Sequence, residues 1–269
     1  MATEFSRQSN PPRRIHWPWL LVGVAWILAI LATLTGQRLL IDHHFLLEES
    51  GFPWPLALAV FLVGWQVMIA AMMMPTSTPF ITTCIVASLA GPHAPRLPHR
   101  AIMMFLLGYA GLWTVFGVLA FAGDTLIHRL VDAWPWLASH ASLIGAATLA
   151  LAGVFQFSSQ KLMYLAHCRA RPEALAGEDA MRARSAYRLG ARHAVDSIGC
   201  CWALMLVLFG IGVGGLGWMV ALTGIMCAET LVSEDVVSGR TRQAIGIVLI
   251  VLAGVWLAHP DWLVGATVV

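Results

Sequence analysis

Long apolar runs separated by short polar segments dominate the pattern of the chain. A helix needs about 20 apolar residues to cross the roughly 30 Å of hydrocarbon in a bilayer. Four runs reach that length and two shorter ones stay strongly apolar: 17–41, 54–74, 101–121, 141–164, 194–212 and 216–232. A seventh run, 244–257, is short, and we expect it to lengthen only past Pro260. The pattern predicts an all-α bundle of about seven transmembrane helices, forming a single integral membrane domain over residues 1–269.

The composition narrows the class of protein. Of the 269 residues, 59% are hydrophobic and only 11% are charged, whereas soluble domains carry charge on about a quarter of their residues. So few charges cannot cover a water-facing surface, and no basic face for nucleic acid is present. The apolar run that follows the amino terminus is too long for a cleavable signal peptide, so we expect it to stay as the first helix. The lipid bilayer is therefore the first expected partner.

The basic residues predict the orientation of these helices. Cytoplasmic loops of membrane proteins carry an excess of Lys and Arg. If the amino terminus lies in the cytoplasm, every basic residue except Arg38 and Arg129 falls on the cytoplasmic side. The largest group lies in and beside a polar segment, about 169–192, which we expect to be a cytoplasmic loop, with part of it, 170–188, either helix or loop. The charge pattern thus predicts a multi-pass protein with a cytoplasmic amino terminus.

Prolines interrupt the second apolar run. Met72-Met73-Met74-Pro75 is followed by Thr76-Ser77-Thr78-Pro79 and a further apolar stretch, 80–90. Proline has no amide hydrogen for the helical hydrogen-bond ladder, so the sequence predicts a kinked backbone here. Irregular backbone at membrane depth is tolerated only where it is buried in protein or lines a wet cavity.

Residues that can bind metals fall at one depth in four of the predicted helices. The second, fourth and sixth helices run inward and the fifth starts at the cytoplasmic side, so their inner thirds share a layer. Helical spacing puts Lys161, Tyr164 and Cys168 on one face. The same spacing groups His193, Asp196 and Cys200, and the layer also contains Met68, Met72, Cys201, Cys227 and Glu229. At about 1.5 Å per residue, all of these lie within roughly 10 Å of the inner boundary.

The donor types in this layer favour a soft metal ion. Thiolate and thioether ligands select Cu(I), while Cys and His together also suit Zn²⁺. None of the five cysteines falls in an expected outer loop, so a disulfide framework is not predicted. Packing alone remains an alternative for a buried Met or Cys. A structural ion pair, or contact with lipid headgroups, remains an alternative for Lys161 and Glu229.

Several motifs resemble a bacterial family of predicted metal-binding integral membrane proteins. They are Trp65-x-x-Met68-x-x-Ala71-Met72-Met73-x-Pro75, Phe155-Gln156-x4-Lys161, Cys168-Arg169-x-x-Pro172, Gly199-Cys200-Cys201-Trp202-x-Leu204-Met205, Trp218-Met219 and Glu229. The resemblance implies a multi-pass protein of the bacterial inner membrane that handles metal. The sequence departs from the family pattern at Tyr164 and Ser197, where the family has Cys, and at Thr230, where it has Lys. These departures leave three alternatives: weaker metal binding, a reduced set of ligands, or a scaffold kept for another purpose.

Three hypotheses for the function follow. The first is a protein that binds or passes a soft transition metal, copper before zinc. Its expected thiolate ligands are Cys200, Cys201 and Cys168, with Met68 and Met72 as thioether ligands, His193 or Glu229 completing the shell, and Lys161 as a charge partner. The second is a proton- or ion-coupled transporter or channel with a relay of Glu229, Lys161 and Asp196, and the third is a non-catalytic subunit of a larger membrane complex. No catalytic triad, phosphate-binding loop or haem motif indicates an enzyme.

Overall fold

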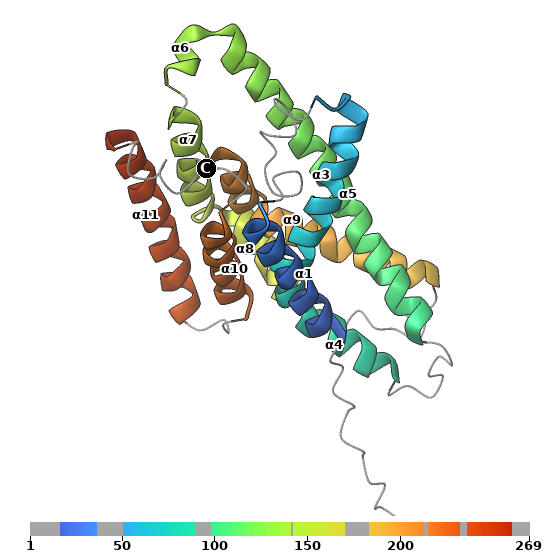
Figure 1. The fold of residues 1–269 in the computed structure, drawn as a ribbon. Coiled ribbons are helices and arrows are strands. Elements are labelled where there is room, and N and C mark those ends of the chain that lie inside the picture. The colour runs from blue at the N-terminus through green and yellow to red at the C-terminus, as the bar shows by residue number, and fades with distance from the viewer. Residues whose placement is uncertain are drawn as a thin grey trace, which may run out of the picture.

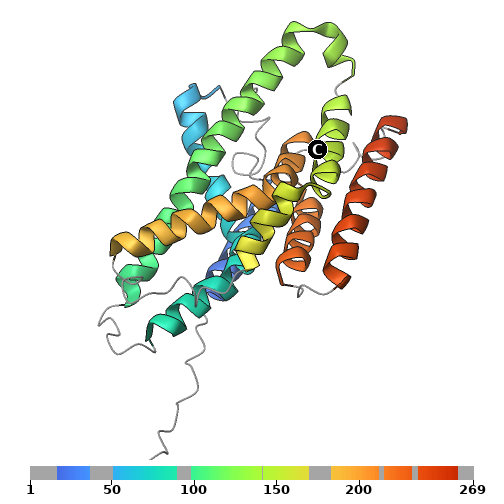
Figure 2. The ribbon, with the colours of Figure 1, turned by 180° about the vertical axis from the view of Figure 1, so that it is seen from behind.

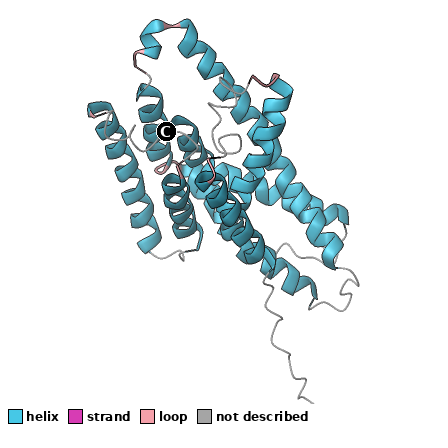
Figure 3. Cartoon of the chain, viewed as in Figure 1, coloured by secondary structure: helices cyan, strands magenta, loops and turns pink. Residues whose placement is uncertain are grey.

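The computed structural model describes residues 17–36, 51–89, 98–140, 142–169, 183–211, 215–231 and 236–259. Within these ranges every regular element is a helix, which confirms the all-α prediction (Figures 1 and 3). The helices are α1 (Trp17–Leu34), α3 (Trp54–Met72), α4 (Met74–Leu89), α5 (Pro98–Ala133), α6 (Pro135–Ala138), α7 (Ser142–Phe155), α8 (Ser159–Arg169), α9 (Ala183–Ile211), α10 (Leu216–Leu231) and α11 (Val236–Ala258).

The number of membrane-length helices is smaller than the sequence suggested. Among the described residues, five helices are long and apolar enough to cross a bilayer: α1, α3, α5, α9 and α11. Helices α7 and α8 would make a sixth together, although they are bent by 69° where they meet, and α10 is apolar but shorter. Large apolar side chains such as Leu20, Val63 and Leu119 are exposed on the outside of the bundle. The fold is therefore compatible with a membrane protein of five or six spans, whereas we expected about seven.

The proline interruption appears as a break at Met73, between α3 and α4. Pro75 stands in the first turn of α4, where a helix has no use for the missing amide hydrogen. The lost ladder bond leaves the carbonyl oxygen of Ala71 without its usual partner, and the indole Nε1 of Trp26 in α1 donates to it at 3.1 Å. The break is thus stabilised by a side chain from a distant part of the chain.

A second break divides the run 141–164, which we expected to be one helix. Helix α7 ends at Phe155 and α8 begins at Ser159, after the bend. The carbonyl oxygen of Gln156 at this bend accepts a hydrogen bond from the guanidinium of Arg242 in α11. Arg242 is buried there, because a buried carbonyl without a helical partner needs another donor.

This contact also explains an incorrect expectation about the last helix. We expected the run 244–257 to lengthen only past Pro260, but α11 instead begins eight residues earlier, at Val236. The added turns include Arg242, whose side chain is needed inside the bundle at the α7–α8 bend. Residues 260–269 lie outside the described part of the chain.

Helix α9 is longer than its apolar core. The polar segment 169–192 was expected to be a cytoplasmic loop or helix, and it is helical from Ala183, while residues 170–182 are outside the described ranges. Small residues at a spacing of four, Ala186, Gly190 and Ala194, are buried in the part of α9 that packs across α5 (Figure 2). A Cβ atom at Gly190 would collide with the backbone of Phe105. Close packing against α5 therefore stabilises the polar first part of α9 as a helix, several residues before its apolar portion begins.

Candidate metal centre

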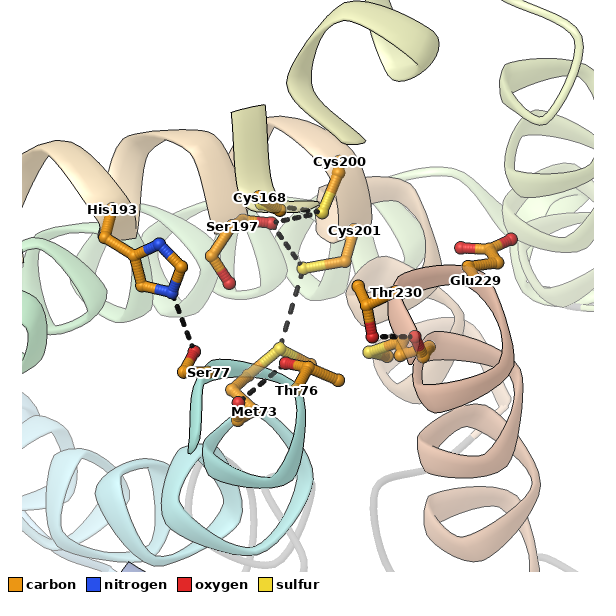
Figure 4. A pocket seen from close by; sticks show the side chains of 11 residues that line it. Met73, Thr76, Ser77, Cys168, His193, Ser197, Cys200, Cys201, Glu229 and Thr230 are labelled. Carbon is orange, nitrogen blue, oxygen red and sulfur yellow. Dashed lines mark hydrogen bonds between the residues drawn. The ribbon is translucent and has the colours of Figure 1, made fainter. Parts of the chain in front are cut away.

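A small pocket lies where the α3–α4 break, the end of α8, the middle of α9 and α10 meet. Its lining comes from the α3–α4 junction, α8, α9 and α10: Met73, Thr76, Ser77, Cys168, His193, Ser197, Cys200, Cys201, Met226, Glu229 and Thr230 (Figure 4). The volume open to the centre of a water-sized particle is about 10 Å³. A volume of that size is close to the minimum needed for one water molecule. The pocket therefore has room for a single small ion.

Four sulfur atoms form a row along this pocket. The Sγ atoms of Cys168 and Cys200 are 3.8 Å apart, and Cys201 Sγ lies 3.7 Å from the thioether Sδ of Met73. Cys200 and Cys201 are joined through Ser197, whose carbonyl oxygen accepts from both thiols at 3.2 and 2.8 Å. Cys168 is half-buried, and the other three residues are buried. The row thus leads from the edge of the bundle to its interior.

The order of residues in α9 produces this arrangement. His193, Ser197, Cys200 and Cys201 follow one another at spacings of four, three and one, so they share one side of the helix. Figure 4 shows them projecting from α9 toward Met73 and Ser77, with Thr230 and Glu229 on α10 beyond. The neighbouring Gly199 lets α8 approach, because a Cβ atom there would meet the ring of Tyr164 at 2.5 Å. That approach brings Cys168 to Cys200.

His193 forms the polar end of the pocket. Its Nε2 atom is within hydrogen-bond distance of the Ser77 hydroxyl, at 3.1 Å, and its ring stacks on Phe80 with 4.2 Å between centroids. The hydroxyl of Ser77 donates its one hydrogen to Tyr109 at 3.2 Å and so accepts from His193, and the Tyr109 hydroxyl lies 3.3 Å from that of Ser197. This network holds the imidazole in one orientation, with one ring nitrogen already hydrogen-bonded.

Lys161 and Glu229 form an ion pair behind the sulfur row. Lys161 Nζ lies 2.8 Å from Glu229 Oε2, and the two side chains are 0% and 4% exposed. A second contact joins α8 to α10 at the same place: Nε of Arg169, on α8, donates to the carbonyl oxygen of Glu229, on α10, at 2.9 Å. Two charges removed from water must compensate each other. The pair therefore adds no net charge to the wall of the pocket.

The structure brings most of the predicted site residues together, but not all of them. Cys168, Cys200, Cys201, His193 and Glu229 line the pocket, as the layer argument expected. Their role as ligands stays a prediction.

The predicted thioether ligands stand elsewhere. Met68 and Met72 are buried but are not among the residues that line the pocket. Met73 has that place. As the C-cap of α3 it still continues the helical path, with its amide donating to the carbonyl oxygen of Ile69 at 2.9 Å, so it faces about 100° away from Met72. Met226 on α10, also in the lining, gave no signal in the sequence.

Asp196 is not part of the pocket lining either. Its Oδ1 atom pairs with Nδ1 of His167 at 3.2 Å, and the His167 side chain is 55% exposed. The relay that we considered from Glu229 through Lys161 to Asp196 is thus seen only in its first step, the ion pair.

The donor set within the described residues is unusual for a metal site. No group of three or more His, Cys, Asp and Glu side chains in these ranges is arranged to hold a metal ion. Structural zinc sites require four such ligands in a tetrahedron. The sulfur row becomes a candidate only when the Met73 thioether is included, and thioethers are ligands of soft ions.

One comparison with known proteins gave a match. Residues 62–257 match the family model PpoB2, which is described as a copper chaperone. No curated protein and no solved structure matches the chain. The matched range begins in α3 and ends in α11, so it contains every residue that lines the pocket.

Proposed function

Because the chain belongs to the PpoB2 copper chaperone family, we propose that it is a multi-pass membrane protein that binds Cu(I) in the sulfur-lined pocket and passes it to an acceptor. The row Cys168, Cys200, Cys201 and Met73 is the observation that carries this proposal. Within each of the pairs Cys168–Cys200 and Cys201–Met73 the sulfurs are less than 4 Å apart, so an ion can be exchanged within a pair by replacing one ligand at a time, and the Ser197 carbonyl oxygen lies between the two pairs. Transfer would then run between the half-buried Cys168 and the buried Cys201–Met73 end.

The chemistry of the pocket favours copper over zinc. Cu(I) prefers thiolate and thioether ligands, and it is stable with two or three of them. Zn²⁺ needs four ligands, normally from Cys, His, Asp and Glu. In the described residues the carboxylate of Glu229 is paired with Lys161, and Nε2 of His193 is engaged by Ser77. Nδ1 of His193 and Oε1 of Glu229 stay available, but most of the potential ligand atoms in the pocket lining are sulfur atoms.

Insertion into the bacterial inner membrane is part of the proposal. The five long apolar helices and the exposed Leu and Val side chains on their outer faces support it. The excess of basic residues on one side supports a cytoplasmic amino terminus. In that orientation the pocket opens toward the cytoplasmic half of the bundle.

Copper titration of the detergent-purified protein tests this proposal. Fully reduced protein is titrated with Cu(I) under anaerobic conditions, in competition with a chromogenic Cu(I) chelator. We expect about one tightly bound Cu(I) per chain, in keeping with the size of the pocket. Replacement of both Cys200 and Cys201 by Ser should weaken binding by at least about a hundredfold, since it removes two of the proposed thiolate ligands.

Cys227→Ser is the matched control. Cys227 is a half-buried free thiol on α10 that does not line the pocket, so this variant should bind Cu(I) like the wild type. A parallel titration with Zn²⁺ should show much weaker binding. If the wild type and the Cys200/Cys201 double variant bind Cu(I) equally, the proposed function is wrong.

A further inference from the structure

The four sulfurs of the row form two pairs with different redox chemistry. Cys168 and Cys200 are both free thiols, on the neighbouring helices α8 and α9, with their sulfurs 3.8 Å apart. The other pair consists of the Cys201 thiol and the Met73 thioether at 3.7 Å. Two thiols can join in a disulfide, whereas a thioether has no S–H bond and cannot. The first pair can therefore give up electrons while the second remains a ligand pair.

The geometry of Cys168 and Cys200 suits disulfide formation. A disulfide bond is about 2 Å long, so the two sulfurs need to approach each other by about 2 Å from their present contact. Rotation of a cysteine side chain about its single χ1 angle moves its sulfur by more than that. Cys168 is the penultimate residue of α8 and is only half-buried, so its side chain has space to turn.

We propose that Cys168 and Cys200 are a reducing dithiol that converts cupric ion to Cu(I) at the mouth of the pocket, ahead of the Cys201–Met73 pair. This inference rests on the proposed function, because it adds a reaction to the same copper-handling site. It makes Cu²⁺ a substrate in addition to Cu(I). The pair that holds the product is not consumed in the reaction.

The reaction balances with cupric ion as the oxidant. Two Cu²⁺ ions each accept one electron, the S–H bonds of Cys168 and Cys200 break, and one S–S bond forms between them. Two protons leave to water, and the products are two Cu(I) and one disulfide. One Cu(I) can stay at Cys201 and Met73, and the other leaves with the acceptor. Two molecules of a small thiol such as glutathione restore the dithiol by exchange and become a disulfide themselves.

The other cysteine with a described side chain, Cys227, serves as a control for this reaction. It lies on α10 outside the pocket lining and has no recorded sulfur neighbour. An unspecific oxidation of thiols by copper would affect it as readily as Cys168, since both are half-buried. The proposal predicts that oxidation is confined to one pair.

The test adds Cu²⁺ to the reduced full-length protein in detergent, without oxygen. A Cu(I)-specific chromogenic chelator counts the product, and mass spectrometry of peptides identifies the disulfide. The wild type and Cys227→Ser should form a Cys168–Cys200 bond and release about one Cu(I) to the chelator while folded, and about two per chain, the electron count of one dithiol, after the protein is unfolded. Cys168→Ser should lose this bond and most of the Cu(I). Cys201→Ser should keep the bond but release all of its Cu(I) to the chelator.

A second oxidant separates this inference from a folding defect and from the proposed function. Diamide, which oxidises thiols without copper, should form the same Cys168–Cys200 bond in the wild type and in Cys201→Ser. Absence of that bond with both oxidants, or an undiminished Cu(I) yield from Cys168→Ser, would overturn the inference. If the protein binds Cu(I) but forms no Cys168–Cys200 disulfide, only this inference is wrong. If it forms the disulfide but retains no Cu(I), the proposed function is wrong instead.

Discussion

At the scale of single residues, Ser197 determines how the pocket is assembled. Its carbonyl oxygen accepts from the thiols of Cys200 and Cys201, and its hydroxyl lies 3.3 Å from that of Tyr109. The family pattern that this sequence resembles has Cys at this position. A thiol in place of the hydroxyl would stand in the pocket lining beside the sulfur row. The Ser197 hydroxyl oxygen is thus a hard potential ligand among soft sulfur ligands.

Ser197→Cys should therefore strengthen Cu(I) binding. A further thiolate within the lining gives the ion another soft ligand, and we expect the affinity to rise about tenfold, equivalent to ~1.4 kcal/mol. The measurement is the same competition with a Cu(I) chelator. Ser197→Ala is the control, since it also loses the contact with Tyr109 but adds no donor. Equal affinities for the two variants would contradict the prediction.

At the scale of helices, the functional residues lie where helices break or cross closely. Met73, at the break between α3 and α4, lines the pocket with its thioether, and the carbonyl oxygen of Ala71 beside this break accepts a hydrogen bond from Trp26. At the bend after Phe155, the carbonyl oxygen of Gln156 accepts a hydrogen bond from Arg242 in the same way. The crossing of α5 and α9 at Gly190 then sets the position of the helix that carries Cys200 and Cys201. The supporting contacts come from helices that contribute no residue to the lining.

Gly190→Ala should destabilise the protein. The new Cβ atom would collide with the backbone of Phe105, which cannot turn aside as a side chain can. Overpacking of this kind lowers the free energy of unfolding by about 1–3 kcal/mol, which thermal unfolding in detergent would detect as a lower midpoint.

Gly254→Ala is the matched control for Gly190→Ala. Gly254 lies within α11 and would place its new Cβ atom in open space. Alanine favours the helix over glycine, so this variant should be more stable by about 0.5–1 kcal/mol. Equal shifts for the two variants would show that the α5–α9 crossing tolerates a larger residue.

At the scale of the whole molecule, the proposed function makes the orientation in the membrane the property that sets which compartment would exchange copper with the pocket. The basic residues predict a cytoplasmic amino terminus and a cytoplasmic segment after α8. Trp134 and Trp136 are exposed at the opposite end, next to the short helix α6. Tryptophan is enriched at the interfaces of bilayers, so these two residues agree with the end of a span.

Reporter fusions check this orientation in cells. Alkaline phosphatase, which is active only outside the cytoplasm, should be active when fused after Ser139 and inactive when fused after Arg171. Green fluorescent protein should give the opposite result, since it fluoresces when it remains in the cytoplasm. The reversed pattern would place the basic segments outside and contradict the predicted topology.

The sequence by itself determined the properties that depend on local order along the chain. Apolar runs predicted α1, α3, α5, α9, α10 and most of α11, because hydrophobicity and helical period are read from neighbouring residues. The same period placed Cys200 with His193 and predicted that Cys168, Cys201 and Glu229 would share a layer, and all five line the pocket.

The tertiary structure alone decided which of several adjacent residues lines the pocket and which residues pair between helices. Successive helical residues differ in direction by about 100°, so only the packing of the end of α3 against α8, α9 and α10 selects Met73 over Met72 as the methionine in the lining. The burial of Arg242, and with it the length of α11, depends on a carbonyl oxygen 86 positions away. The pairing of Lys161 with Glu229 and of Cys168 with Cys200 likewise requires helices that pack against each other in space. These are long-range contacts, and no local pattern encodes them.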